Sequence, residues 1–159
     1  MTRKKTKSLQ RVLMPDRKYN SVLVQRLINK TMLSGKKQVA ERSVYDAMAI
    51  AAKKLKSDDP LAIFERAIKN VYPNVEVKGR RVGGANYQIP FPVAGNRQQH
   101  LAFMWFVQAA RTRKGMPVAE RLAAEMVDAF NQTGGAYKKR EDTHRTAEAN
   151  RAFAHFARV

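Results

Sequence analysis

Apolar residues recur at intervals of three and four positions through most of the chain, which is the spacing of one face of an α-helix. In the first such segment Leu23, Leu27, Ile28 and Met32 form the apolar face, and Gly35 is expected to end the helix. The same period predicts six helices, over about 21–34, 38–55, 60–72, 96–114, 118–133 and 138–156. We therefore expect a mainly helical protein.

Individual helices carry further signals. Ser57-Asp58-Asp59-Pro60 places capping side chains, acids and a first-turn proline just ahead of the third helix, and Pro73 ends it. The fourth helix is apolar on most sides around Trp105, so we expect it to be central and buried. The sixth has few large aliphatic residues and is expected to lie on the outside.

The period changes between the third and fourth helices. Residues 75–78 and 87–89 alternate between apolar and polar, which is typical of β-strands, and the basic, glycine-bearing segment 79–85 is expected to form a long hairpin tip. Pro90 and Pro92 cannot donate ladder hydrogen bonds, which favours an edge or exit position. Two short strands are not stable alone, so this hairpin must pack on helices or on a ligand.

These elements predict a single, mainly α domain over residues 19–159, with about six helices and a β-hairpin at about 74–92 that protrudes between helices three and four. Residues 1–18 are expected to be a basic N-terminal arm, because they carry seven cations against Asp16 alone. Leu9, Val12, Leu13 and Met14 suggest that this arm docks once its charge is neutralised.

Charge indicates the class of partner. The chain has 31 Lys and Arg against 13 Asp and Glu, a formal net charge of +18 in 159 residues. Such a chain requires a polyanion, which is nucleic acid, an anionic membrane or an acidic protein. The cations lie in the arm, the turns and the hairpin and not along one amphipathic helix, which argues against a membrane surface. No groove-reading element for DNA is evident, so folded RNA fits best, with a general architectural nucleic-acid-binding protein as the alternative.

Catalytic and metal chemistry find little support. The chain has no cysteine, and His100, His144 and His155 are scattered without carboxylates at ligand spacing. Gly83 and Gly84 lack the Lys-Ser/Thr of a phosphate-binding loop. We therefore expect no enzyme, cofactor or metal. No signal peptide is expected, and the longest apolar run, Leu101 to Val107, is too short to cross a membrane.

Three blocks of sequence resemble one known family. Val75 to Pro90, reading VEVKGRRVGGANYQIP, looks like the signature hairpin of the small-subunit ribosomal protein S7 (uS7) family, bacterial type. The stretch 138–155 is similar to that family's C-terminal helix, and Gly35-Lys36-Lys37 matches a third block. The chain differs from common bacterial members at Phe91 to Gly95 and at its last four residues.

The resemblance implies a primary binder of 16S rRNA in the 3′ major domain that nucleates assembly of the 30S head and contacts exit-site tRNA and mRNA. It implies the S9 and S11 proteins as neighbours and a cytoplasmic location in the ribosome, with an organellar ribosome left open. The arm, the basic turn after helix one and the hairpin would meet RNA, and the other basic clusters complete the candidate set. The candidate RNA-binding residues are Arg3, Lys4, Lys5, Arg11, Lys36, Lys37, Lys78, Arg80, Arg81, Arg113, Lys114, Lys138, Lys139 and Arg140.

Overall fold

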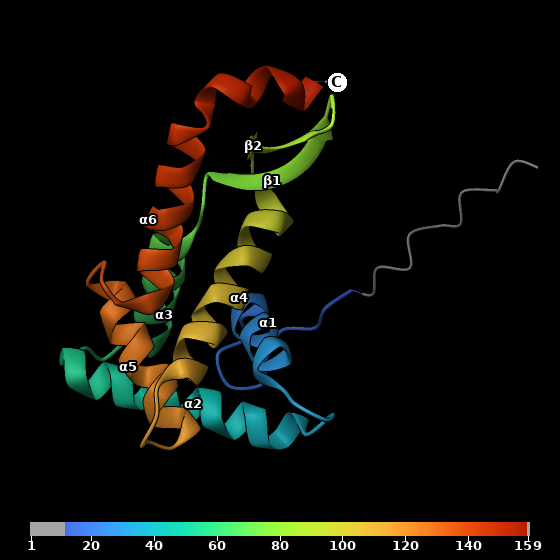
Figure 1. Ribbon diagram of the computed structural model, residues 1–159. Helices are drawn as coiled ribbons and strands as arrows, with labels where there is room; N and C mark the ends of the chain where they lie inside the picture. The colour runs from blue at the N-terminus through green and yellow to red at the C-terminus, as the bar shows by residue number, and fades with distance from the viewer. Residues whose placement is uncertain (1–11, 159) are drawn as a thin grey trace, which may run out of the picture.

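The structure, a computed structural model, describes residues 12–158, and most of the predicted arm lies outside this range. Six α-helices, one β-hairpin and a terminal 3-10 helix follow one another within it (Figure 1). Their bounds are α1 Val22–Thr31, α2 Lys37–Leu55, α3 Pro60–Val71, β1 Val75–Val82, β2 Ala85–Pro92, α4 Gly95–Thr112, α5 Val118–Phe130, α6 Gly134–Ala149 and η1 Arg151–Arg158. The predicted fold class, mainly helical with a hairpin between the third and fourth helices, is confirmed.

One hydrophobic core joins the helices. Phe64 of α3, Phe106 of α4 and Met126 of α5 are fully buried, and Trp105 is also buried. The rings of Phe64 and Phe103 stack with centroids 6.4 Å apart, which ties α3 to α4. Helix α6 runs along the outside of the bundle and buries only Ala136 and Ala147 (Figure 1). The central position predicted for the fourth helix and the outer position predicted for the sixth are both confirmed.

Helix ends follow local chemistry where a capping side chain is present. Asp59 caps α3, since its Oδ1 accepts hydrogen bonds from the backbone N–H of Leu61 at 2.9 Å and Ala62 at 3.1 Å. The predicted end of the first helix at Gly35 is wrong, because α1 ends at Thr31 and Gly35 lies in the following turn with φ +72°. The predicted start of the sixth helix is late, because α6 already begins at Gly134.

The hairpin differs from the expected long tip. β1 and β2 pair antiparallel from Val75↔Pro92 to Val82↔Ala85, so only Gly83 and Gly84 form the turn. Both glycines have positive φ, +57° and +91°, which a two-residue hairpin turn requires and side chains disfavour. The cations expected in a loop therefore lie within strand β1.

The hairpin is supported by the C-terminal 3-10 helix, as its length required. Tyr87 of β2 contacts Phe153 and Phe156, with ring centroids 5.0 and 5.7 Å apart, and Ile89 is fully buried. Tyr87 is half-buried among these aromatic side chains, because η1 folds back over β2 (Figure 1). Its ring therefore serves to hold the hairpin.

Candidate nucleic-acid interface

The basic turn between α1 and α2 is a compact, exposed feature. Ser34 and Gly35 both have positive φ, and the backbone N–H of Lys36 and Lys37 bond to Leu33 and Gly35 at 3.0 and 2.8 Å. Lys36 and Lys37 are exposed. The turn thus holds two adjacent ammonium groups away from the core. Two such exposed ammonium groups can contact the phosphates of a nucleic-acid backbone.

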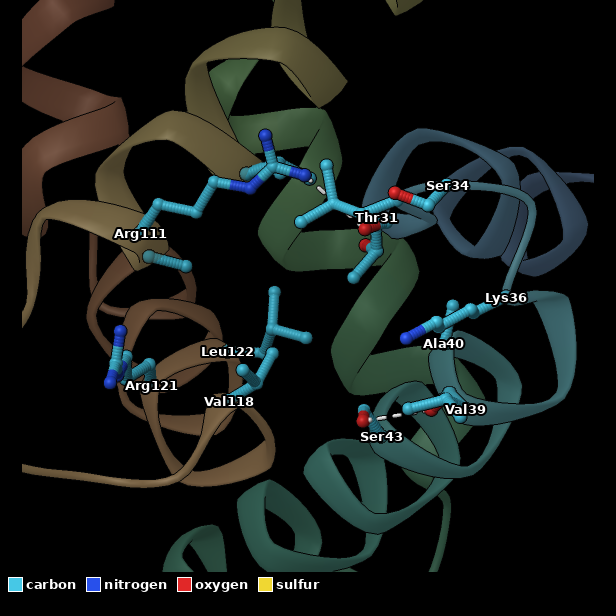
Figure 2. A pocket seen from close by; sticks show the side chains of 13 residues that line it. Thr31, Ser34, Lys36, Val39, Ala40, Ser43, Arg111, Val118, Arg121 and Leu122 are labelled. Atoms are coloured by element: carbon cyan, nitrogen blue, oxygen red, sulfur yellow. Dashed lines mark hydrogen bonds between the residues drawn. The ribbon is translucent and has the colours of Figure 1, made fainter.

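The two lysines of this turn border different hollows. Lys36 lines one that lies between the turn and helices α4 and α5, together with Arg111 and Arg121 (Figure 2). Lys37 lines another beside Leu13 and Arg17, at the start of the described chain. The turn therefore contributes cations to both sides of the α1–α2 junction.

A buried carboxylate fixes the segment that enters α1. Asp16 is 3% exposed and accepts hydrogen bonds from the backbone N–H of Tyr19 at 2.9 Å and Ser21 at 2.8 Å, and from the Tyr45 hydroxyl at 3.0 Å. Burial alone raises the pKa of Asp16, but the hydrogen bonds outweigh it, so this pKa lies below its usual value. Burial and the bond to Asp16 raise the pKa of Tyr45 to about 12. The last residues of the predicted arm are thus anchored on α2.

A second buried carboxylate holds the base of the hairpin. Glu76 of β1 accepts from Arg97 Nε at 3.0 Å and Arg97 Nη2 at 2.8 Å, and Lys78 Nζ lies 2.6 Å from it. Burial acts to raise the pKa of Glu76, but hydrogen bonds from Lys78 and Arg97 lower it on balance. Lys78 is therefore partly neutralised within the protein. It is a weaker candidate for a free phosphate contact than its sequence position suggested.

The two remaining hairpin candidates, Arg80 and Arg81, are both exposed. They pair with Tyr87 and Asn86 in the ladder. Because successive side chains of a strand point to opposite faces, the two guanidinium groups leave the hairpin on opposite sides. Arg80 also lies over the ring of Phe91, 5.8 Å from its centroid. The hairpin thus presents positive charge in two directions.

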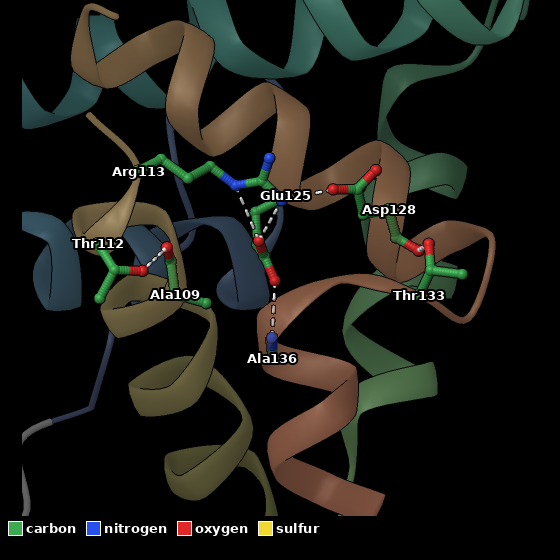
Figure 3. Close-up of polar contacts among 7 residues, drawn as sticks. All are labelled: Ala109, Thr112, Arg113, Glu125, Asp128, Thr133 and Ala136. Atoms are coloured by element: carbon green, nitrogen blue, oxygen red, sulfur yellow. Dashed lines mark hydrogen bonds and ion pairs between the residues drawn. The ribbon is translucent and has the colours of Figure 1, made fainter. Parts of the chain in front are cut away.

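Arg113, in the loop after α4, is part of an internal network (Figure 3). Its guanidinium donates to Glu125 Oε2 at 3.1 and 2.7 Å and also bonds to Asp128. The second oxygen of Glu125 accepts the backbone N–H of Ala136 at 2.7 Å. Burial acts to lower the pKa of Arg113, but the bonds to Glu125 and Asp128 raise it on balance. Arg113 thus connects the α4–α5 loop to α5 and to the start of α6, while its neighbour Lys114 is exposed.

Close packing at the start of α6 completes this network. A Cβ on Gly134 would lie 2.8 Å from Asp128 Cβ, and φ there is +88°. A Cβ on Gly135 would lie 3.1 Å from Ala109 Cβ. The glycines therefore let the first turn of α6 approach α4 and α5. This approach explains why the helix begins where sequence reasoning placed a break.

The three cations at the start of α6 separate around the helix. Lys138 and Lys139 are exposed, whereas Arg140 is half-buried over the ring of Tyr137, 5.1 Å from its centroid. Arg140 lines a hollow on the α3 side together with Arg66 and Lys69. Lys139 lines a different one near Glu76 and Trp105. The basic cluster therefore faces more than one direction.

A polar hollow of about 550 Å³ between α1 and α4 was not predicted. Arg26, Lys30 and His100 line it, and Arg26 donates to Gln99 and Asn96 across the helix pair. Burial, and then the charges of Lys30 and Arg97, lower the pKa of His100. The signal was present in the four-residue spacing of Arg26 and Lys30. Sequence reasoning did not use it because the hollow forms only when α1 packs on α4.

Four of the fourteen sequence candidates, Arg3, Lys4, Lys5 and Arg11, lie outside the described residues. The others fall into exposed and internally bonded groups. Among the described residues, no group of three or more His, Asp and Glu could hold a metal ion, and no helix is long and apolar enough to cross a membrane. The surface offers exposed cations on several sides.

Comparison with known proteins agrees with this surface. The family described as ribosomal protein S7p/S5e matches residues 2–151. Small ribosomal subunit protein uS7 of Dictyoglomus turgidum is 60% identical over 146 residues, covering 92% of this chain and 93% of the relative. The uS7 protein of Chloroflexus aggregans is 55% identical over 149 residues, and 94% of each chain is covered. These relatives are ribosomal proteins and not enzymes. The chain therefore belongs to the ribosomal protein S7p/S5e family, the uS7 proteins of the small ribosomal subunit.

Proposed function

We propose that this protein is a structural constituent of the small ribosomal subunit that binds 16S rRNA in its 3′ major domain and nucleates assembly of the 30S head. The observation that carries this proposal is the set of exposed cations fixed on rigid elements, above all the Lys36-Lys37 turn. A folded RNA with several helices can meet such cations from several directions. A single groove of duplex DNA would contact the cations on one side of the protein only.

The hairpin has a different role in this proposal. It contacts exit-site tRNA and mRNA through Arg80 and Arg81, which are exposed on opposite faces of β1. The S9 and S11 proteins are the proposed protein neighbours, and the proposed location is the cytoplasmic ribosome. The candidate arm residues Arg3, Lys4, Lys5 and Arg11 would add phosphate contacts beside the anchored segment at Asp16.

Filter binding tests the RNA assignment. We expect the full chain to bind the 3′ major-domain RNA of 16S rRNA much more tightly than an unrelated RNA of equal length. Its affinity should fall steeply as salt rises, because each phosphate contact releases counterions. Equal affinity for the two RNAs at moderate salt would remove the specific site. Equal competition by duplex DNA would favour the alternative, a general architectural nucleic-acid-binding protein.

A further inference from the structure

The hollow between the α1–α2 turn and helices α4 and α5 differs from the others in its lining (Figure 2). It has a volume of about 550 Å³, within the range of about 300–1,000 Å³ that small-molecule sites occupy. Its walls are mostly aliphatic, and Val39 and Val118 remain 63% and 49% exposed. The aliphatic lining residues are Leu33, Val39, Ala40, Val107, Ala110, Val118 and Leu122.

Positive charge surrounds these aliphatic walls. Lys36 from the turn, Arg111 from α4 and Arg121 from α5 border the hollow, and no Asp or Glu lines it. Arg111 donates to the backbone oxygen of Thr31 and Arg121 to that of Met116. Within residues 12–158 none of these three cations forms an ion pair, in contrast to Lys78, Arg97 and Arg113. Their charges are therefore available to an anionic partner.

Polar residues border the same hollow. Thr31 and the exposed Ser34 both line it, beside the aliphatic walls. An occupant therefore fits this lining with an apolar face, a polar edge and negative charge beside it.

We propose that this hollow receives a single nucleobase extruded from the bound RNA, with the adjoining phosphates on Lys36, Arg111 and Arg121. The proposal rests on the RNA-binding function proposed above. A nucleotide is the unit that joins a flat, weakly polar ring to negative charge on both sides, and unstacked bases are the ones that proteins read in RNA. Helical RNA with all bases stacked offers only the phosphates and leaves the aliphatic walls uncovered.

Filling the hollow tests this directly. Val39→Trp and Val118→Trp add bulk at exposed positions and remove no cation, and Val22→Trp, at an exposed valine on α1 outside the lining, is the matched control. We expect each of the first two variants to bind the 3′ major-domain RNA several-fold more weakly, because the added side chain occupies the space that the base would fill. The slope of log affinity against log salt should not change, because no phosphate contact is lost.

Removing the arginines that border the hollow should, in contrast, change the salt dependence of binding. Arg111→Ala with Arg121→Ala should weaken binding and reduce the salt slope by about two, one for each phosphate contact. Circular dichroism melts of all variants establish that they are folded. Wild-type protein that fails to prefer the 3′ major-domain RNA would overturn the proposed function itself. A wild-type preference with Val39→Trp equal to Val22→Trp would overturn only the nucleobase site.

An abasic scan identifies the base. Unpaired nucleotides of the RNA are replaced one at a time by abasic sites, and each RNA is measured with wild type and with Val39→Trp. At one position the abasic site should weaken wild-type binding several-fold yet cost the variant little, which is the coupling of two changes at one contact. Additive losses at every position would overturn the proposal. Unchanged RNA affinity with weaker incorporation into subunits would overturn it in favour of a protein occupant.

Discussion

The buried acids of the described residues are Asp16, Glu76 and Glu125. Each of them bonds to a segment that also carries basic residues. Asp16 holds the entry to α1, Glu76 the base of the hairpin, and Glu125 the loop that carries Arg113 and Lys114. Buried carboxylates are stable only when hydrogen-bonded or paired, and here the partners are the segments themselves. In a chain of charge +18, a few acids thus position the surrounding cations.

Glu125 gives the clearest prediction at this scale. Glu125→Ala leaves Arg113 and the backbone N–H of Ala136 without their shared acceptor. We expect the free energy of unfolding to fall by about 3 kcal/mol. This is at the lower end of the loss expected when a buried ion pair is broken, because Arg113 is partly exposed. Urea denaturation measures it. Glu148→Ala, at an exposed position on α6, is the control, and equal losses in the two variants would contradict the role of the network.

The hairpin shows how an element gains support from a distant part of the chain. Within residues 12–158 the sheet has only these two strands, and η1 covers β2 through contacts of Tyr87 with Phe153 and Phe156. Of the cations on β1, Lys78 pairs with Glu76 and Arg80 lies over the ring of Phe91. The aromatic residues that join the hairpin to η1 thus differ from Arg80 and Arg81, the proposed RNA contacts.

Arg80→Ala with Arg81→Ala tests this separation. We expect weaker tRNA binding at the exit site of reconstituted subunits, because two exposed charges are removed, with little change in melting temperature. Lys53→Ala with Lys54→Ala removes the same charge from exposed positions at the end of α2 and is the control. A much lower melting temperature of the hairpin variant alone would show that these arginines stabilise the fold.

The whole molecule should lose stability in acid, and the sign follows from the carboxylates. The pKa values of Asp16 and Glu76 in the folded protein lie below their ordinary values of 3.8 and 4.5. Their contribution is therefore complete above those ordinary values and is lost as pH falls through the folded ones. Protonation also increases the net positive charge, which adds repulsion.

Denaturation across a pH series checks this expectation. The wild type should lose stability as pH falls below about 4.5, the ordinary pKa of a glutamate. Asp16→Asn should be less stable than wild type at pH 7, and this difference should shrink as the pH falls below 4. The difference between wild type and Asp58→Asn, an exposed position, should stay small throughout. A constant difference for Asp16→Asn would contradict the anchoring role of this carboxylate.

The sequence by itself determined the helical period, the cap at Asp59, the presence of the hairpin and the excess of positive charge. These features depend on residues within a few positions of one another, or on composition alone. The family resemblance rested on motifs of the same local kind. The short hairpin turn at Gly83-Gly84 was also within reach, since paired glycines favour a two-residue turn.

Only the tertiary structure decided which cations form ion pairs within the protein and which remain available to a partner. The partners of Arg113 and Arg97 lie 12 and 21 residues away, and no local pattern joins them. The hollow bordered by Lys36, Arg111 and Arg121 likewise requires the α1–α2 turn to pack beside α4 and α5. Charge is additive along a chain, but its availability depends on neighbours brought together by folding. The sequence therefore gives the sum of +18, and the fold determines where that charge can meet RNA.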